Sequence, residues 1–202
     1  MGPSIRSFIA IDLSQNSRRQ IETVVRELRK SDAQVGWVRV EAIHLTLKFL
    51  GNVDPELIER IKPALAREAS KTGPIRLEAA GCGAFPGVKS PRIIWVGLRG
   101  AIAPLVELAR NVDEALVPLG FKPEERPFTP HLTIGRVKGR GRLHALQEML
   151  RAHAGFAAEP FDAARIVLYK SVLRPDGARY TPLFETPLSG NPATADDKPY
   201  PL

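Results

Sequence analysis

IHLTLKFLG (residues 43–51) and PHLTIGRV (residues 130–137) are two stretches that contain the same short word, a histidine followed two positions later by a threonine. The chain has 202 residues and only 4 histidines, and these two words use two of them. In both stretches apolar residues alternate with polar ones, which is the pattern of a β-strand with one buried face. The position of these two strands therefore decides where the polar pairs lie.

Strand geometry assigns the side chains of each word to opposite faces. Residues i and i+2 of a strand point to the same side. We therefore expect His44, Thr46 and Lys48 on one face of the first strand, and His131 and Thr133 on one face of the second. The leucine and isoleucine residues between them are expected to pack into the core. Each word then presents a histidine–threonine pair on an apolar anchor.

Around the two words, strand-like segments alternate with helix-like ones. Strands are predicted at 7–13, 43–51, 75–86, 92–98, 127–137, 161–171 and 179–188, and helices at about 15–28, 55–65, 104–119 and 141–154. The order of elements in the first half recurs in the second, which predicts an α+β fold of two similar lobes, each with one word. We expect a single bilobal domain over 1–188. The tail over 189–202 is expected to be disordered, because it has no hydrophobic periodicity and many breakers.

Two imidazoles and two hydroxyls make a set of groups suited to acid–base chemistry on a phosphodiester. Near neutral pH one histidine can accept a proton from an attacking water, and the other can donate one to the departing oxygen. Threonine hydroxyls can donate hydrogen bonds to the phosphate oxygens. One such word alone is more often structural, with its imidazole bonded to a backbone carbonyl. Two words in matching strand context favour a joint functional role. No metal-binding motif is recognisable, so we expect no metal and no cofactor.

Composition describes a basic chain of ordinary hydropathy. It has 29 Lys and Arg against 22 Asp and Glu, a net charge of +7, which favours anionic partners such as nucleic acid. The single cysteine, Cys82, excludes an internal disulfide and is expected to pack as a small hydrophobe. No apolar run approaches the roughly 20 residues that span a bilayer. We therefore expect no membrane association, a cytoplasmic location and a monomer.

The paired words and their surroundings resemble the 2H phosphoesterase superfamily, and within it the RNA 2′,3′-cyclic phosphodiesterases, formerly called 2′-5′ RNA ligases. The resemblance covers nearly the whole chain. It includes RSFIAIDL, WVRVEAIHLTLKFLG, GCGAFPGVKSPRIIWVGL, LGFKPEERPFTPHLTIGRV and LYKSVLRPDGARYTPL. It implies a bilobal fold with two pseudo-twofold-related lobes of antiparallel sheet and helices around a central cleft.

The resemblance also implies an activity and the roles of four residues. Members of the family open a terminal 2′,3′-cyclic phosphate of RNA and leave a 2′-phosphate. Carried over to this chain, His44 is the general acid that protonates the 3′ oxygen, and His131 is the base that activates water. Thr46 and Thr133 bind the phosphate oxygens. Some members also join 2′-5′ linkages in vitro, which is the same chemistry with a 5′-hydroxyl in place of water.

Four further residues are candidate substrate contacts, each with a structural alternative. Lys48 shares its predicted face with His44, or else is a solvated lysine near the end of the strand. Arg136 lies on the wrong side of its strand by simple alternation, and needs a twist or bulge at Gly135 to reach the cleft. Its alternative role is that of a structural salt-bridge partner. Arg126 has similar standing. Phe8 is a candidate for stacking on the terminal base, with core packing as the alternative.

Three functions remain open from the sequence. The expected substrates are RNA 3′ ends with a 2′,3′-cyclic phosphate, tRNA fragments among them, or cyclic nucleotides. The basic loop at 137–142 favours RNA. A cyclic phosphodiesterase of small nucleotides is the alternative enzyme. A non-catalytic module that binds RNA ends is the alternative without turnover.

Overall fold

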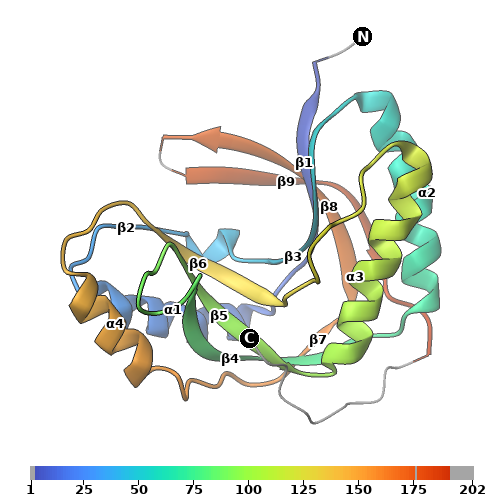
Figure 1. Ribbon diagram of the computed structural model, residues 1–202. Coiled ribbons are helices and arrows are strands. Elements are labelled where there is room, and N and C mark those ends of the chain that lie inside the picture. The colour runs from blue at the N-terminus through green and yellow to red at the C-terminus, as the bar shows by residue number, and fades with distance from the viewer. Residues whose placement is uncertain (1–2, 176, 192–202) are drawn as a thin grey trace.

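The computed structural model describes residues 3–175 and 177–191, which form two antiparallel β-sheets with helices against them (Figure 1). The first sheet has the strand order β3 (Leu45–Val53), β1 (Ile5–Ile11), β8 (Arg165–Arg174), β9 (Gly177–Pro187). The second has the order β2 (Val35–Trp37), β6 (His131–Val137), β5 (Ile93–Gly100), β4 (Ile75–Phe85), β7 (Phe161–Ala163). The α+β class and the placement of one motif strand in each sheet are confirmed.

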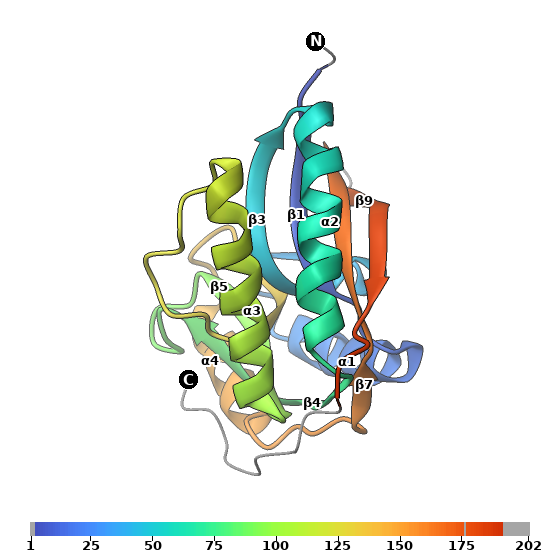
Figure 2. The same ribbon diagram turned by 90° about the vertical axis from the view of Figure 1, so that its right-hand side faces the viewer.

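The helices pack in two pairs. α2 (Pro55–Lys71) and α3 (Ile102–Leu116) lie side by side against the first sheet, as Figure 2 shows. α1 (Gln15–Arg29) and α4 (Leu143–Ala152) contact each other beside the second sheet. Ser14 caps α1, because its hydroxyl oxygen accepts a 3.0 Å hydrogen bond from the amide of Ser17. Among the described residues, no helix is both long and apolar enough to cross a membrane.

The two sheets are not the two halves of the chain. β2 pairs with β6 in the second sheet, a 3₁₀ turn at Val40–Ala42 follows, and the chain then enters β3 of the first sheet. The predicted strand at 161–171 is likewise two strands, β7 and β8, which belong to different sheets. The break falls at Ala164, whose carbonyl accepts a hydrogen bond from the amide of Leu188 instead of continuing one ladder. Each crossing ties the two sheets together.

A single hydrophobic cluster spans both sheets and their helices. Ile9 and Leu45 in the first sheet and Leu132 and Ile134 in the second are fully buried. The apolar residues of both words therefore anchor the two motif strands, as their alternation predicts.

The chain remains bonded to the fold for a short distance past residue 188. The amide of Ser189 donates to the carbonyl of Ala69, and that of Gly190 donates to the carbonyl of Thr72, both at the end of α2. These residues are part of the packed structure, in contrast to the disorder expected from 189 onward. The rest of the predicted tail, 192–202, lies outside the described residues.

Gly135 allows β2 to approach the second motif strand closely. A Cβ at this position would lie 2.8 Å from Val35 Cγ1 and 3.0 Å from Trp37 Cε3. We expect Gly135→Ala to lower the free energy of unfolding by about 1–3 kcal/mol, because the added methyl overpacks a buried contact. Urea unfolding measures this. Gly155→Ala is the matched control, since nothing lies within 4 Å of its Cβ position. Equal stabilities of the two variants would contradict the account.

Candidate active site

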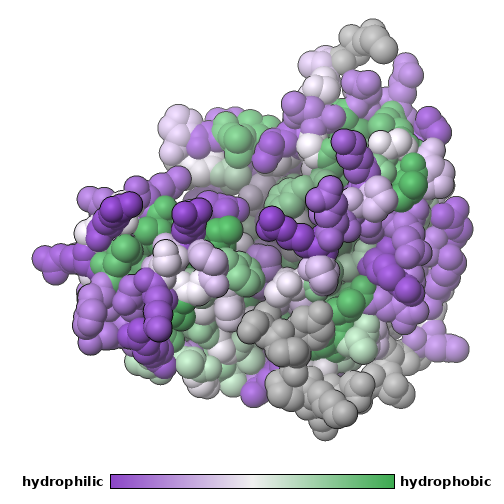
Figure 3. Space-filling model, in the orientation of Figure 1, coloured by the Kyte–Doolittle hydropathy of each residue, from purple (hydrophilic) through white to green (hydrophobic). Residues whose placement is uncertain are grey.

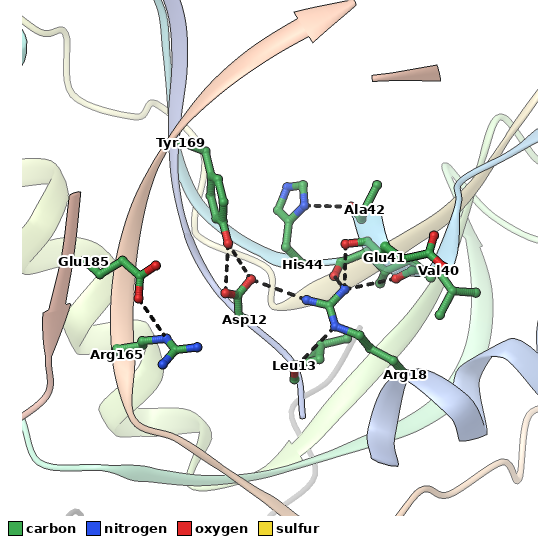
Figure 4. Close-up of polar contacts among 11 residues, drawn as sticks. Asp12, Leu13, Arg18, Val40, Glu41, Ala42, His44, Arg165, Tyr169 and Glu185 are labelled. Atoms are coloured by element: carbon green, nitrogen blue, oxygen red, sulfur yellow. Dashed lines mark hydrogen bonds and ion pairs between the residues drawn. The ribbon is translucent and has the colours of Figure 1, made fainter. Parts of the chain in front are cut away.

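His44 lies at the entrance to β3, directly after the 3₁₀ turn. Its Nδ1 is 2.8 Å from the carbonyl oxygen of Ala42 (Figure 4). A carbonyl can only accept, so Nδ1 carries the proton and Nε2 is left for another partner. The ring stacks on Phe8, with ring centroids 4.5 Å apart, and meets the ring of Tyr180 edge-on at 5.1 Å. The imidazole is therefore held in one orientation and one tautomer.

His131 repeats this arrangement in the second sheet. It is the first residue of β6, and its Nδ1 is 2.8 Å from the carbonyl oxygen of Thr129, again two residues earlier. Phe85 meets its ring edge-on, with centroids 5.0 Å apart. Thr133 and Thr46 follow their histidines on the same strand faces, and both threonines are half-buried. Both words thus present a tethered imidazole and a hydroxyl.

The two motif strands meet where the sheets join. β3 and β6 are in contact, and the amide of Val38, between β2 and the 3₁₀ turn, donates to the carbonyl of Ile134 in β6 at 2.9 Å. The segment that carries His44 is therefore bonded directly to the strand that carries His131. The face of the molecule drawn in Figure 3 is mainly hydrophilic, with hydrophobic residues in separate groups.

The prediction that Lys48 shares the face of His44 is wrong. β3 has an extra residue, Leu47, at this point of its pairing with β1, so Thr46 pairs with Ala10 but Lys48 pairs with Ile9, which faces the core. This β-bulge turns Lys48 toward the helices. Only 3% of its side chain is exposed, and its ammonium group binds Asp113 of α3.

Lys48 organises the loop that follows α3. It donates to the carbonyl of Lys122 at 2.9 Å and lies 3.6 Å from a carboxylate oxygen of Glu124. Arg126 lies in the same loop and lines a recess of about 550 Å³ together with Phe49 and Phe121. Phe49 is 60% exposed, because the bulge places it on the face that alternation assigns to Lys48. Arg126 thus lies beside Phe49, whose ring is 5.9 Å from that of Phe8 beneath His44.

Phe8 is not open to a base. It is 2% exposed and is covered by His44, Tyr169, Tyr180 and Phe49, whose rings lie between 4.5 and 5.9 Å from its own. The structure places it beneath His44, where it supports the imidazole. The expectation that it stacks on the terminal base is therefore corrected.

Arg136 has the bulge that it needs to reach the cleft. β6 has one extra residue, Ile134, relative to β5, so Thr133 pairs with Trp95 and Gly135 with Ile94. Arg136 then lies on the Thr133 side of the strand and is exposed. Its positive charge acts to lower the pKa of the Tyr180 hydroxyl, which belongs to the other sheet.

Comparison of the sequence with those of known proteins shows the family to which the chain belongs. The family model of the 2′-5′ RNA ligase superfamily matches residues 17–174. The chain belongs to the 2′-5′ RNA ligase superfamily. It is 32% identical over 177 residues to the RNA 2′,3′-cyclic phosphodiesterase of Methanothermobacter thermautotrophicus, covering 88% of this chain and 95% of the relative. It is 36% identical over 176 residues to that of Methanocaldococcus jannaschii, covering 87% and 96%.

A solved structure of the superfamily has the same fold. The crystal structure of Escherichia coli LigT complexed with 3′-AMP superposes with a TM-score of 0.72 at 25% sequence identity, covering 92% of this chain and 99% of LigT. The family and the fold class expected from the paired words are both confirmed.

In this superfamily member, several residues near His44 carry no signal in the sequence. Tyr180 comes from β9, far along the chain, and touches the imidazole ring. Burial raises the pKa of its hydroxyl, while the positive charges of Arg136, Arg6 and Arg39 act in the opposite direction. Basic side chains from both sheets therefore lie near the Tyr180 hydroxyl. Only the strand pairing brings these residues together.

Asp12 and Arg18 are two further residues that the motifs do not reveal. Asp12 follows β1 and accepts hydrogen bonds from the hydroxyl of Tyr169, and Arg18 of α1 reaches the turn before His44. Figure 4 shows both beneath the His44 ring. Within the described residues, no group of three His, Cys, Asp or Glu side chains could hold a metal ion.

Burial of the imidazole lowers the pKa of His44 to about 4, against the opposing effects of the Ala42 hydrogen bond and the Asp12 charge. The unfolded chain binds a proton at His44 near its ordinary pKa of 6.5, whereas the folded protein does so only near 4. The neutral ring therefore stabilises the fold above pH 6.5, and this contribution is lost as the pH falls toward 4.

We expect this one group to reduce the free energy of unfolding by roughly 2 kcal/mol between pH 7 and pH 5. Urea unfolding of the wild type and of His44→Gln at both pH values isolates the effect, because all other groups titrate in both proteins. The wild type should lose more stability than the variant. Equal losses would show that His44 titrates normally in the folded protein.

Proposed function

We propose that this chain hydrolyses the 2′,3′-cyclic phosphodiester at the 3′ end of RNA and leaves a 2′-phosphate. The observation that carries the proposal is the matched pair of histidines. Each comes from its own sheet, each has Nδ1 bound to a carbonyl two residues earlier, and the strands that hold them are in contact. The names of the related proteins, RNA 2′,3′-cyclic phosphodiesterases, support the same reaction.

The proposed reaction uses Nε2 of both rings. His131 accepts a proton from water as the water oxygen bonds to phosphorus. The pKa of His44, about 4 in the free protein, is expected to rise when the anionic phosphate binds beside the ring. The bond between phosphorus and the 3′ oxygen breaks, and the His44 ring protonated in this way donates its proton to that oxygen. The product is a 2′-phosphomonoester with a free 3′-hydroxyl. The acid and base labels follow the family resemblance, because the two sites are alike in their tethering.

Thr46 and Thr133 are proposed to donate hydrogen bonds to the non-bridging phosphate oxygens, where negative charge is held through the transition state. Each threonine lies two residues after its histidine on the same strand face. A 5′-hydroxyl that replaces the attacking water would give a 2′-5′ linkage by the same steps. We propose that activity as a property in vitro.

RNA is the proposed substrate because the chain is basic and arginines lie near Tyr180, which contacts the His44 ring. Arg136 lies on the Thr133 side of β6, Arg126 lines the recess beside Phe49, and the whole chain carries a net charge of +7. An RNA end brings additional phosphates that a cyclic mononucleotide lacks, and basic side chains bind phosphates independently of sequence. Fragments of tRNA are included among these ends. We propose that the protein acts as a monomer in the cytoplasm.

The test is a ³¹P NMR time course with a short RNA that ends in a 2′,3′-cyclic phosphate, in the presence of EDTA. The signal of the cyclic diester should be replaced by that of a 2′-phosphomonoester. A parallel reaction with a 2′,3′-cyclic mononucleotide should have a lower kcat/KM. Equal values would favour a phosphodiesterase of small nucleotides, and binding of the RNA without conversion would favour a module that only recognises the end.

A further inference from the structure

Arg18 binds most of the backbone carbonyls in the turn that leads into His44. Its Nη1 is within 2.8–3.0 Å of three carbonyl oxygens, those of Val40, Glu41 and Ile43. Its Nε donates to the carbonyl of Leu13 at 3.4 Å. One guanidinium group thus connects the end of β1 with three of the four residues before His44. Only 18% of the Arg18 side chain is exposed.

The fourth carbonyl of that turn belongs to Ala42 and is the one that binds His44 Nδ1. The carbonyls on either side of Ala42, those of Glu41 and Ile43, bind Arg18. Figure 4 shows the Glu41 carbonyl bound to Arg18 and the Ala42 carbonyl bound to the imidazole. Because Arg18 holds the carbonyls of Glu41 and Ile43, it also orients the carbonyl of Ala42 that lies between them. The corresponding turn before His131 contains Pro127 and Pro130, whose rings fix φ. Residues 38–43 contain no proline.

Asp12 is the acidic residue that contacts Arg18. Its carboxylate lies 3.4 Å from Nη2 of Arg18, and both of its oxygens are 2.8 Å from the hydroxyl of Tyr169. The pKa of that hydroxyl is raised, by burial and by the neighbouring Asp12, so it remains a donor. The carboxylate of Asp12 acts to raise the pKa of the His44 ring.

We propose that Arg18 and Asp12 are positioning residues for His44: Arg18 fixes the turn that holds the imidazole, and Asp12 favours its protonated form. This inference rests on the function proposed above, in which His44 donates a proton. The groups that face the ring are Phe8 and Asp12 around β1, Arg18 of α1, Tyr169 of β8 and Tyr180 of β9. Asp12 is the one acidic side chain among these five.

The expected effect of Arg18→Met is a loss of kcat with little change in KM, because the substrate contacts remain while the imidazole loses its fixed orientation. Small misplacement of a catalytic group typically costs about 10- to 100-fold in rate. Arg18→Lys should recover part of the loss. Arg19→Met is the matched control, since Arg19 is an exposed arginine on the same helix.

The experiment combines these kinetics with ¹⁵N-edited NMR of the His44 ring. Wild type and Arg19→Met should show a single tautomer protonated at Nδ1, whereas Arg18→Met should show averaged ring nitrogen shifts. Asp12→Asn should keep the tautomer but lower the pH at which the ring titrates. If Arg18→Met does not fold, Arg18→Lys and Asp12→Asn carry the same test.

Unchanged ring signals and unchanged kcat in folded Arg18→Met, matched to Arg19→Met, would overturn the inference. A lower stability with normal kcat and a normal ring spectrum would also overturn it, since that result describes a purely structural arginine. If the wild type fails to hydrolyse cyclic-phosphate RNA, the proposed function fails. The ring spectrum and titration still decide whether Arg18 and Asp12 position the imidazole.

Discussion

Replacing either His44 or His131 by alanine should lower kcat/KM for cyclic-phosphate RNA by at least about 10²-fold, the usual scale for a lost general acid or base. Each ring is tethered through Nδ1 and presents Nε2, so neither can take over the role of the other. The double variant should be little worse than either single one, because groups that act in one step are not additive.

His144→Ala is the matched control for both substitutions. His144 lies on α4 with 82% of its side chain exposed, so its removal should leave the rate unchanged. Steady-state kinetics with a fluorescent RNA end measures all four proteins. Turnover that survives in either His44→Ala or His131→Ala at the level of His144→Ala would rule out the paired mechanism.

Lys48→Met should lower the free energy of unfolding by about 3–5 kcal/mol, because it leaves the largely buried carboxylate of Asp113 without its counter-ion. The Lys48 side chain is 3% exposed and that of Asp113 is 16% exposed. Asp113 keeps a hydrogen bond from the amide of Glu124, which stabilises only part of its charge. Adding Asp113→Asn should restore some of the lost stability.

Lys30→Met provides the comparison for this substitution, since Lys30 pairs with Glu27 on the surface of the protein. Exposed pairs of this kind contribute about 0–1 kcal/mol. Urea unfolding measures each variant. A loss for Lys48→Met no larger than that for Lys30→Met would contradict the buried ion pair. A large rise in KM of the folded variant would restore Lys48 as a substrate contact.

The alternation of apolar and polar residues at the start of each word was sufficient to predict which side chains face the core. Leu45, Leu132 and Ile134 are fully buried, and the threonines are half-buried on the opposite side. The helices and the α+β class also follow from periodicity and turn residues. These features depend on local sequence, which is why a single chain reveals them.

The rest of the site depends on where strands pair. An extra residue in β3 turns Lys48 to the core, and nothing in IHLTLKFLG indicates a bulge. The requirement for a bulge near Gly135 was recognisable for Arg136, because its basic side chain conflicts with strict alternation. Phe8 lies on the cleft side of β1, but aromatic rings from β3, β8 and β9 cover it. Such contacts join residues far apart in the chain.

The central claim is that His44 and His131 bind one phosphate together. NMR spectra of the histidine rings during titration with a nucleoside 2′-monophosphate, the product of the proposed reaction, test it most directly. The signals of His44 and His131 should shift with one dissociation constant, and the pKa of His44 should rise beside the anion. His144 should not respond. A response from only one of the two rings, or different dissociation constants for them, would contradict the claim.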